Sequence, residues 1–164
     1  ESSREQDWLK TNLAKFSGMM QGQRDLATLG QMLLSELAPL VDAQQGLIYI
    51  VENDETLARA RLRRLAAYAD ATPGDTARRI EFGEGLVGQC AAQGQMILLE
   101  DLKADQVRIA SGLFSAVPRS VIVLPVLFED QIKAVIELAS LGEFSPSQRT
   151  FLEQLSGSTG IVLN

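Results

Sequence analysis

Two long apolar runs near the end of the chain constrain its fold more than any other feature. SVIVLPVLFED covers residues 120–130 and IKAVIELAS covers residues 132–140, with a tight turn at Glu129-Asp130-Gln131. Runs of this composition predict two paired antiparallel strands, although Pro125 interrupts the first. Both strands are apolar on both faces, so other parts of the chain must cover each side of the sheet that contains them.

Helices at both ends of the chain are predicted to supply one covering layer. The first 45 residues have helical spacing, and Gly18 and Gly22 predict a break near residues 21–23. Ser145 and Pro146 are typical of the first residues of a helix, which predicts a final helix at the C-terminus. Leucines on one face mark a second helix before Gly46, and they are Leu26, Leu29, Leu33, Leu37 and Leu40.

Short segments between the helices predict the rest of the sheet. LIYIVE (47–52), RIEF (79–82) and MILLED (96–101) have the composition of strands. RARLRRLAAYA (59–69) fits a strand with one wet face or a short helix, and we favour the strand because residues 47–52 need a hydrogen-bonding neighbour. These elements predict an α/β (α+β) sandwich with a mostly antiparallel sheet, and loops at residues 70–78 and 102–118.

Composition excludes several kinds of chemistry. The 164 residues include no histidine and one cysteine, Cys90. Histidine-ligated zinc or haem, a Ser-His-Asp triad and an internal disulfide are therefore impossible. The acidic residues are scattered rather than clustered, so we expect no metal site and no cofactor. The net charge of −6 disfavours a nucleic-acid partner.

The ends of the chain bear on its location. The sequence has no apolar run of 18 residues and no basic-then-apolar leader. We therefore expect a cytoplasmic domain without direct membrane contact. The chain begins with Glu1 rather than Met, which suggests a piece of a longer signalling protein.

The string GEGLVG (83–88) allows two interpretations. It matches the GxGxxG pattern of dinucleotide-binding turns, in which glycines let a pyrophosphate approach a helix N-terminus. It also fits a tight turn that leads into a short helix at 86–93. The unit from Arg79 to Asp101 is shorter than the roughly 30 residues of a dinucleotide-binding unit, and RIEF lacks a buried apolar run. We favour the tight turn.

The chain also resembles the GAF domain family. Three segments carry the resemblance in the family's order and spacing: FGEGLVG (82–88) with Ala91, Gly94 and Asp101; SVIVLPV (120–126), similar to a strand with a Ser…Pro pattern; and VIEL (135–138) with Phe144. The resemblance covers residues 25–163. It implies a central, mainly antiparallel sheet of five or six strands. It further implies terminal helices on one face and short helices or loops over a small-molecule pocket on the other.

A narrower resemblance concerns the two ends. WLKTNLAKFSGMMQGQRDL (8–26) and GSTGIVLN (157–164) resemble GAF modules that lie between HAMP repeats and the kinase core of (hybrid) sensor histidine kinases. This resemblance implies a signalling coiled-coil helix at residues 1–22 and a GAF domain at 23–164. It also implies a place in a two-component phosphorelay, with the kinase activity elsewhere in the parent protein.

A seam of heptad type runs along the first helix. It consists of Leu9, Leu13, Phe16 and Met20. A helix this short needs a partner for its seam, which is either the domain's own sheet or the same helix of a second copy. The family resemblance implies the second, so a parallel homodimer is expected.

The implied pocket restricts the ligand and names its candidate residues. Bilin, haem and methionine-sulfoxide-reducing relatives use histidines or several cysteines that this chain lacks, and no cyclic-nucleotide pattern is found. Glu137 lies in an apolar strand, where a carboxylate needs either a pairing arginine or amide, or a pocket. Further polar candidates are Tyr49, Tyr68 and Arg119, and apolar wall candidates are Phe82, Leu86, Cys90 and Phe114. Cys90 is otherwise a small buried apolar residue.

Three functions follow for comparison. The first is a non-catalytic sensory module that binds a small ligand and passes helix motion to a histidine kinase. The second is a ligand-free dimerisation and relay domain. The third is an enzyme, but no two carboxylate, Lys, Ser or Tyr residues have a spacing that suggests a catalytic pair. The arginines at 59, 61, 63 and 64 fit either an anion or acidic-partner surface or a solvated strand face.

Overall fold

The computed structural model describes residues 2–23, 25–54, 56, 58–69, 78–102, 109–110 and 115–163. Within these ranges the elements are α1 (Ser2–Gln21), α2 (Leu26–Leu40), β1 (Gln45–Asp54), β2 (Arg59–Tyr68), β3 (Arg79–Glu81), α3 (Gly85–Gln93), β4 (Ile97–Glu100), β5 (Ile109–Ala110), β6 (Ser115–Ala116), β7 (Ser120–Phe128), β8 (Gln131–Ser140) and α4 (Pro146–Leu163). The predicted helix break agrees with this structure, as does the order of the helices and of the six longer strands. The expectation of a loop at residues 102–118 was incomplete, because the short strands β5 and β6 lie there and pair with each other.

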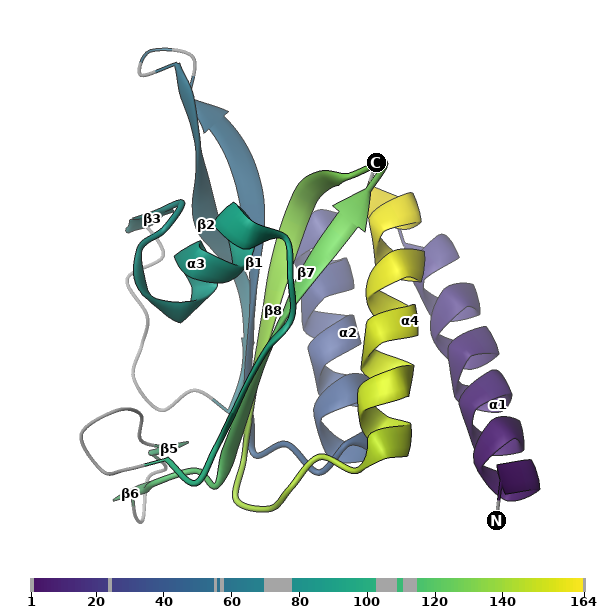
Figure 1. Cartoon of the computed structure of the whole chain (residues 1–164). Helices are drawn as coiled ribbons and strands as arrows, with labels where there is room; N and C mark the ends of the chain where they lie inside the picture. Colours follow the sequence, from purple (N-terminus) through teal and green to yellow (C-terminus); the bar gives the residue numbers. More distant parts are fainter. Residues whose placement is uncertain are drawn as a thin grey trace.

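A six-stranded sheet in the order β3-β2-β1-β8-β7-β4 forms the centre of the molecule (Figure 1). Each neighbouring pair in it is antiparallel. The ambiguous segment at 59–69 is a strand, as favoured from the sequence. β7 and β8 form the predicted hairpin, and its turn residues Glu129 and Asp130 have φ values of 50° and 64°. Positive φ at both turn positions matches the twist of the flanking strands.

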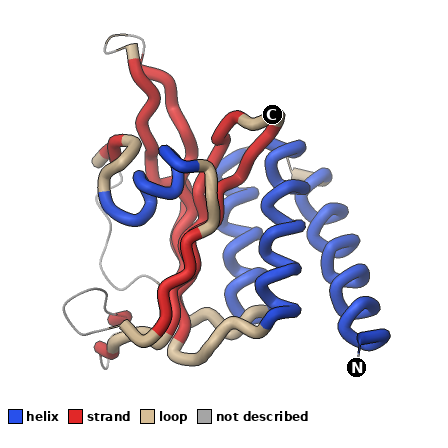
Figure 2. The backbone as a smooth tube through the Cα atoms, viewed as in Figure 1, coloured by secondary structure: helices blue, strands red, loops and turns tan. Residues whose placement is uncertain are grey.

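The three terminal helices lie on one side of the sheet and α3 lies on the other (Figure 2). α2 packs against β1 and β2, α4 packs against β7 and β8, and α1 packs against α4 and α2. We term the side covered by α2 and α4 the helix face and the opposite side the α3 face. This arrangement confirms the expected α+β fold, with the terminal helices on one face.

Aromatic packing joins α1 to the helix face. The ring of Phe151 on α4 meets Trp8 and Phe16 of α1 edge-on, at centroid distances of 5.4 Å and 5.5 Å. Phe16 and Met20 are fully buried in the core of this face. Leu9 and Leu13 pack against it and are partly buried. The seam of α1 therefore has a partner within its own chain.

Side chains fix the starts of α2 and α4. Asp25 precedes α2, and its carboxylate accepts a hydrogen bond from the Thr28 amide at 3.0 Å. Ser145 precedes α4, where its hydroxyl accepts from the Gln148 amide at 3.1 Å while the Gln148 side chain accepts from the Ser145 amide at 2.8 Å. This reciprocal pair is a capping box, which confirms the predicted start of the last helix.

Gly160 sets how closely α4 approaches the sheet. A Cβ atom added at this residue would lie 2.0 Å from the carbonyl oxygen of Leu127 in β7. Any side chain there would force the helix and the strand apart. The end of α4 is therefore in direct contact with the β7–β8 hairpin.

Pro125 lies at a position of β7 that tolerates proline. β4 pairs with β7 only from Ser120 to Val123, so β7 continues past the end of β4. Beyond Val123, the described residues place no strand on the outer side of β7. A missing N–H group is tolerated at such an edge.

Candidate functional site

The α3 face has its own apolar core, which holds α3 on the sheet. Its buried members are Leu62, Val87, Cys90, Ala91, Val121, Val123, Val135 and Ala139. Tyr49, Val51, Ile80 and Leu86 pack against them and are partly buried. The sequence-predicted residues Tyr49, Leu86 and Cys90 therefore share this face.

The glycine string forms a tight turn between β3 and α3. Gly83 and Gly85 have φ values of 92° and 63°, which favour glycine. The Gly83 amide donates a 2.7 Å hydrogen bond to the Gly88 carbonyl, and a Cβ on Gly88 would lie 2.3 Å from the Glu81 carbonyl oxygen. β3 and β4 each pair antiparallel with their neighbours, unlike the parallel strands of a dinucleotide-binding unit. The structure agrees with the tight-turn interpretation.

A hollow of about 170 Å³ opens on the α3 face beside β3. Its lining residues are Tyr49, Arg64, Arg78 and Ile80. Tyr49 and Arg64 face each other directly across β1 and β2. An aromatic ring and two guanidinium groups therefore surround this small space.

Glu137 lies on the same face, one strand further into the sheet. Val135 and Ala139, two residues before and after it, belong to the α3-face core. Its neighbours across the sheet are Leu47 on β1 and Val123 on β7. Tyr49 is two residues along β1 from Leu47, which makes it a diagonal neighbour of Glu137.

The carboxylate of Glu137 is mostly buried and has no partner among the described residues. Within the described part of the chain, no N–H or O–H group donates a hydrogen bond to it and no cation pairs with it. Burial raises the pKa of Glu137, because an apolar environment disfavours the charged form. The sequence left two alternatives for Glu137, a pairing arginine or amide, or a pocket. The described residues provide no pairing arginine or amide.

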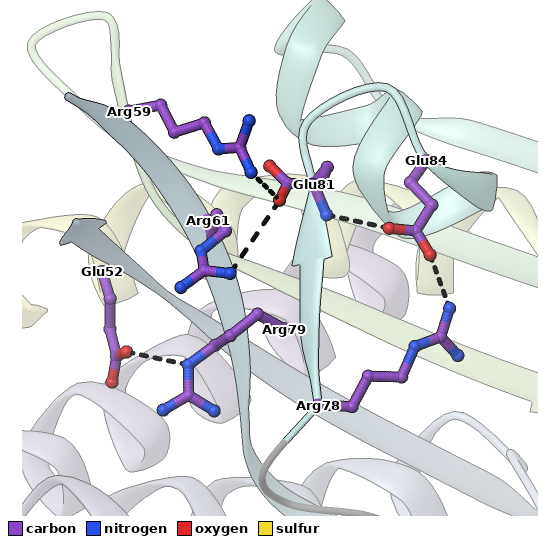
Figure 3. Close-up of polar contacts among 7 residues, drawn as sticks. All are labelled: Glu52, Arg59, Arg61, Arg78, Arg79, Glu81 and Glu84. Atoms are coloured by element: carbon purple, nitrogen blue, oxygen red, sulfur yellow. Dashed lines mark hydrogen bonds and ion pairs between the residues drawn. The ribbon is translucent and has the colours of Figure 1, made fainter. Parts of the chain in front are cut away.

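Ion pairs occupy most of the arginines on β2 and β3 (Figure 3). Arg59 and Arg61 approach the Glu81 carboxylate at 2.8 Å and 4.0 Å, and Arg78 pairs with Glu84. The Glu52 carboxylate accepts from Arg63 and, at 3.2 Å, from Arg79. The hydrogen bond from Arg63 holds the pKa of Glu52 below its usual value. Carboxylates on β1, on β3 and before α3 therefore neutralise most of this arginine cluster.

Two predicted polar residues lie away from the α3 face. Tyr68 packs against the core of the helix face, so it does not share a cavity with Tyr49. Arg119 is exposed and pairs with Glu143 at 2.6 Å, next to the loop that leads into α4. Contrary to the expectation from the sequence, neither residue lines the hollow beside Tyr49.

The remaining predicted residues differ in position. Phe82 follows β3 and is 38 % exposed. Phe114 lies outside the described residues.

Two residues that line the hollow, Arg64 and Arg78, were not predicted from the sequence. Arg64 could have been found, because it alternates with Arg59, Arg61 and Arg63 along the strand and so belongs to the other face.

Cys90 is poorly suited to chemistry. It is fully buried, and its thiol donates a 3.3 Å hydrogen bond to the Gln95 carbonyl. Burial raises the pKa of this thiol to about 12, so the reactive thiolate is strongly disfavoured.

Two further searches cover only the described residues. In those ranges, no three His, Cys, Asp or Glu side chains come together as a metal ion would require. None of the helices formed by these residues has the length and apolar character needed to cross a membrane.

One of three comparisons with known proteins identifies a family. The family model described as "GAF domain" matches residues 23–164. No curated protein matches the chain. Solved structures match across nearly its whole length at low identity, which shows the fold alone.

Three of these structures illustrate the range. The GAF domain of an Acinetobacter phosphoenolpyruvate-protein phosphotransferase is 17% identical, with a TM-score of 0.73 over 92% of this chain and 89% of that one. A free methionine-R-sulfoxide reductase from Neisseria meningitidis, in complex with its substrate, is 19% identical, with a TM-score of 0.69 over 92% and 85%. A methyl-accepting chemotaxis protein fragment is 12% identical, with a TM-score of 0.67 over 90% and 94%.

Proposed function

Because this chain belongs to the GAF domain family, we propose that it is a regulatory sensory domain that binds a small organic ligand on its α3 face. It has no catalytic activity of its own in this proposal. It acts in the cytoplasm as part of a larger bacterial signalling protein, with a histidine kinase as its output.

The carboxylate of Glu137, which has no partner within the described ranges, carries this proposal. A buried charge without a hydrogen-bond partner costs free energy, and burial raises the pKa of this group in agreement. Glu137 lies one diagonal step from Tyr49, which lines the hollow on the same face. A ligand that supplies donors to this carboxylate would offset the cost.

A mechanical route from this face to α4 supports a sensory role. Glu137 is on β8, β8 pairs with β7, and β7 touches α4 at Leu127 and Gly160. A ligand that binds two arrangements of the hairpin unequally would shift the position of α4. α4 would then pass this shift to the output domain.

The proposal excludes reductase chemistry like that named for some structural neighbours. Those enzymes are free methionine-R-sulfoxide reductases. This chain has a single cysteine, so it cannot form an internal disulfide. The burial of Cys90 and its raised thiol pKa further support a structural role for it.

A ligand-free dimerisation and relay domain is the second candidate. The small volume of the hollow, about 170 Å³, and the exposed Ile161 on α4 favour it. The homodimer expected through Leu9, Leu13, Phe16 and Met20 stays a proposal. Because Phe16 and Met20 are buried against α4 in one chain, such a dimer would use the partly buried Leu9 and Leu13.

Native mass spectrometry tests the ligand-binding proposal. The protein purified from cells is compared in its native and denatured states, and then screened against metabolites by thermal shift. We expect a non-covalent adduct or a metabolite-dependent rise in Tm, which Glu137→Gln weakens. Glu143→Gln, which changes an exposed carboxylate, is the matched control and should behave like the wild type. Absence of both signals would favour the relay domain, and the native mass would report whether it is a dimer.

A further inference from the structure

We propose that a notch between the two central hairpins of the sheet is a second ligand site, which takes a small carboxylic acid with one charge and an apolar body. The notch lies beyond the last pair of β1 and β8, and none of the described residues that line it belongs to α3. Its site differs from the hollow on the α3 face and does not depend on Glu137. The lining residues that define it here are Ile50, Val51, Phe82, Ile132, Lys133 and Leu163.

A β-bulge opens the notch. The pairing of β1 with β8 ends at Ile50 and Ala134, and beyond this point β1 continues with β2 and β8 continues with β7. In β8, Lys133 is an extra residue between the positions that pair with Val126 and Leu127 of β7. A bulge bends its strand and increases the local twist. The two hairpins therefore diverge, and Figure 1 shows the tips of β1 and β2 apart from those of β7 and β8.

The notch is large enough for a small organic molecule and has apolar walls from both sides of the sheet. Its volume is about 490 Å³, whereas that of the hollow is about 170 Å³. Known ligand pockets occupy roughly 300–1,000 Å³. Val51 and Ile132 pack with the core of the α3 face, and Leu163 of α4 packs with the core of the helix face. The notch is therefore a passage at the end of the sheet rather than a space under α3.

Lys133 selects an anion. It is the one charged residue among the described residues that line the notch. Its side chain is half-buried, and no described residue forms an ion pair with it, including the exposed Glu129 and Asp130 of the adjacent turn. An ammonium group has three donors and no acceptor, so a carboxylate in the notch supplies what it lacks. A single cation matches a carboxylate, whereas a phosphate group carries up to about two charges.

The strand edges supply further polar partners for the same ligand. Past Ile50, β1 has a strand neighbour on one side only, and β8 does before Ala134, among the strands that the structure describes. Backbone N–H groups on such an edge are available to a ligand. The exposed amides of Asn53 and Gln131 line the same space. The carboxylate would bind among these donors, while Phe82 and the other apolar walls contact the body of the acid.

A ligand in the notch would contact the last turn of α4 directly. Leu163 lines the notch, and Gly160, three residues earlier, meets the carbonyl of Leu127 beside the bulge. Occupation of the notch would therefore favour one separation of the β7–β8 hairpin and α4 over others. This places a second input at the helix end to which the proposed function assigns the output.

Amide NMR spectra of the full chain, titrated with matched probes, test this proposal. Isovalerate and phenylacetate are the acids, and isoamyl alcohol and phenethyl alcohol are their uncharged counterparts. We expect saturable shifts of the amide signals of Val51, Ile132 and Leu163 with the acids, and binding of the alcohols about tenfold weaker or worse. Lys133→Gln should reduce the affinity for the acids to that for the alcohols. Lys10→Gln, which removes an exposed charge from α1, is the matched control and should bind like the wild type.

A second variant tests the apolar wall. Phe82→Ala shortens a side chain that is 38 % exposed, so the variant should fold, and it should weaken both acids and both alcohols. Unchanged affinities in this variant would contradict the assignment of Phe82 to the site. The dispersion of the amide spectrum verifies the fold of each variant before titration.

The other outcomes separate this proposal from the proposed function. Acids that bind no more tightly than the alcohols would overturn the role of Lys133. Shifts confined to Tyr49, Ile80 and Leu86 would overturn the notch and support a ligand on the α3 face. Absence of saturable shifts with every probe would overturn the notch site, whereas the α3 face is decided by the metabolite screen with Glu137→Gln.

Discussion

The two faces of the sheet are built from the same strands but differ in what covers them and in the polar groups they bury. On the helix face, the buried hydroxyls of Ser156 and Thr159 donate to carbonyls one turn earlier at 2.9 Å and 2.8 Å, and aromatic rings interlock. On the α3 face, Glu137 stays unpartnered within the described residues, beside a hollow. Each face also keeps polar groups that lack a partner among the described residues, since Ser120 Oγ on β7 and Arg149 Nε on α4 are buried without one. The α3 face differs in that its unpartnered group is a carboxylate near a hollow.

Truncation of Phe151 should have the largest effect, because it breaks the helix face at its centre. Phe151 is fully buried and contacts rings from α1. Phe151→Ala should lower the free energy of unfolding by about 3–5 kcal/mol, measured by urea denaturation. A loss below about 1 kcal/mol would contradict the central role assigned to this packing.

A matched pair of glycines on α4 tests the close contact between that helix and β7. Gly160→Ala should destabilise the chain by about 1–3 kcal/mol, because the new Cβ would overlap the Leu127 carbonyl. Gly157→Ala, three residues earlier, has open space around its Cβ and should stabilise the chain by up to about 1 kcal/mol. Thermal unfolding of both variants checks the sign, and equal effects would contradict the close approach.

On the α3 face, Glu137→Gln should raise the free energy of unfolding, in contrast to the truncation of Phe151 on the helix face. Burial raises the pKa of Glu137 in the folded chain, so its ionisation costs stability once the pH exceeds the ordinary carboxyl value. The variant should exceed the wild type by on the order of 1 kcal/mol at pH 7. This advantage should shrink as the pH falls through the ordinary carboxyl value and vanish well below about 4, where the wild-type side chain is protonated in both states. A destabilised variant at pH 7 would indicate that the carboxylate has a partner.

Removal of an exposed ion pair should have the smallest effect. Arg119 and Glu143 are both more than half exposed in their side chains. Arg119→Gln should change the free energy of unfolding by less than about 1 kcal/mol, and less still at high salt. Ligand binding should be unchanged in the same variant. A binding defect would restore Arg119 to the site.

Local patterns were sufficient to predict most of the fold. The β7–β8 hairpin, the break before α2 and the capping box at Ser145 each depend on residues close together in the sequence. Glu137 was also detectable, because a carboxylate within an apolar strand is unusual. These features need no knowledge of long-range packing.

A β-bulge explains why Tyr68, a candidate for the pocket, lies on the helix face. Ile48 pairs with Ala66 while Tyr49 pairs with Arg64, so Leu65 is an extra residue in β2. The extra residue reverses the alternation of faces beyond it. Tyr68 consequently packs on the helix face, whereas strict alternation from Leu62 would place it on the α3 face. The position of such a bulge depends on the partner strand, which the local sequence does not reveal.

The edges of the sheet also affect whether copies of this chain can associate by pairing their strands. β3 is an edge strand whose Arg79 and Glu81 are engaged in ion pairs, and Pro125 interrupts the donors of β7 beyond β4. Charged side chains and proline at sheet edges oppose the addition of foreign strands, which is the first step toward fibrils. These edges therefore oppose polymerisation of the molecule through its backbone at high concentration.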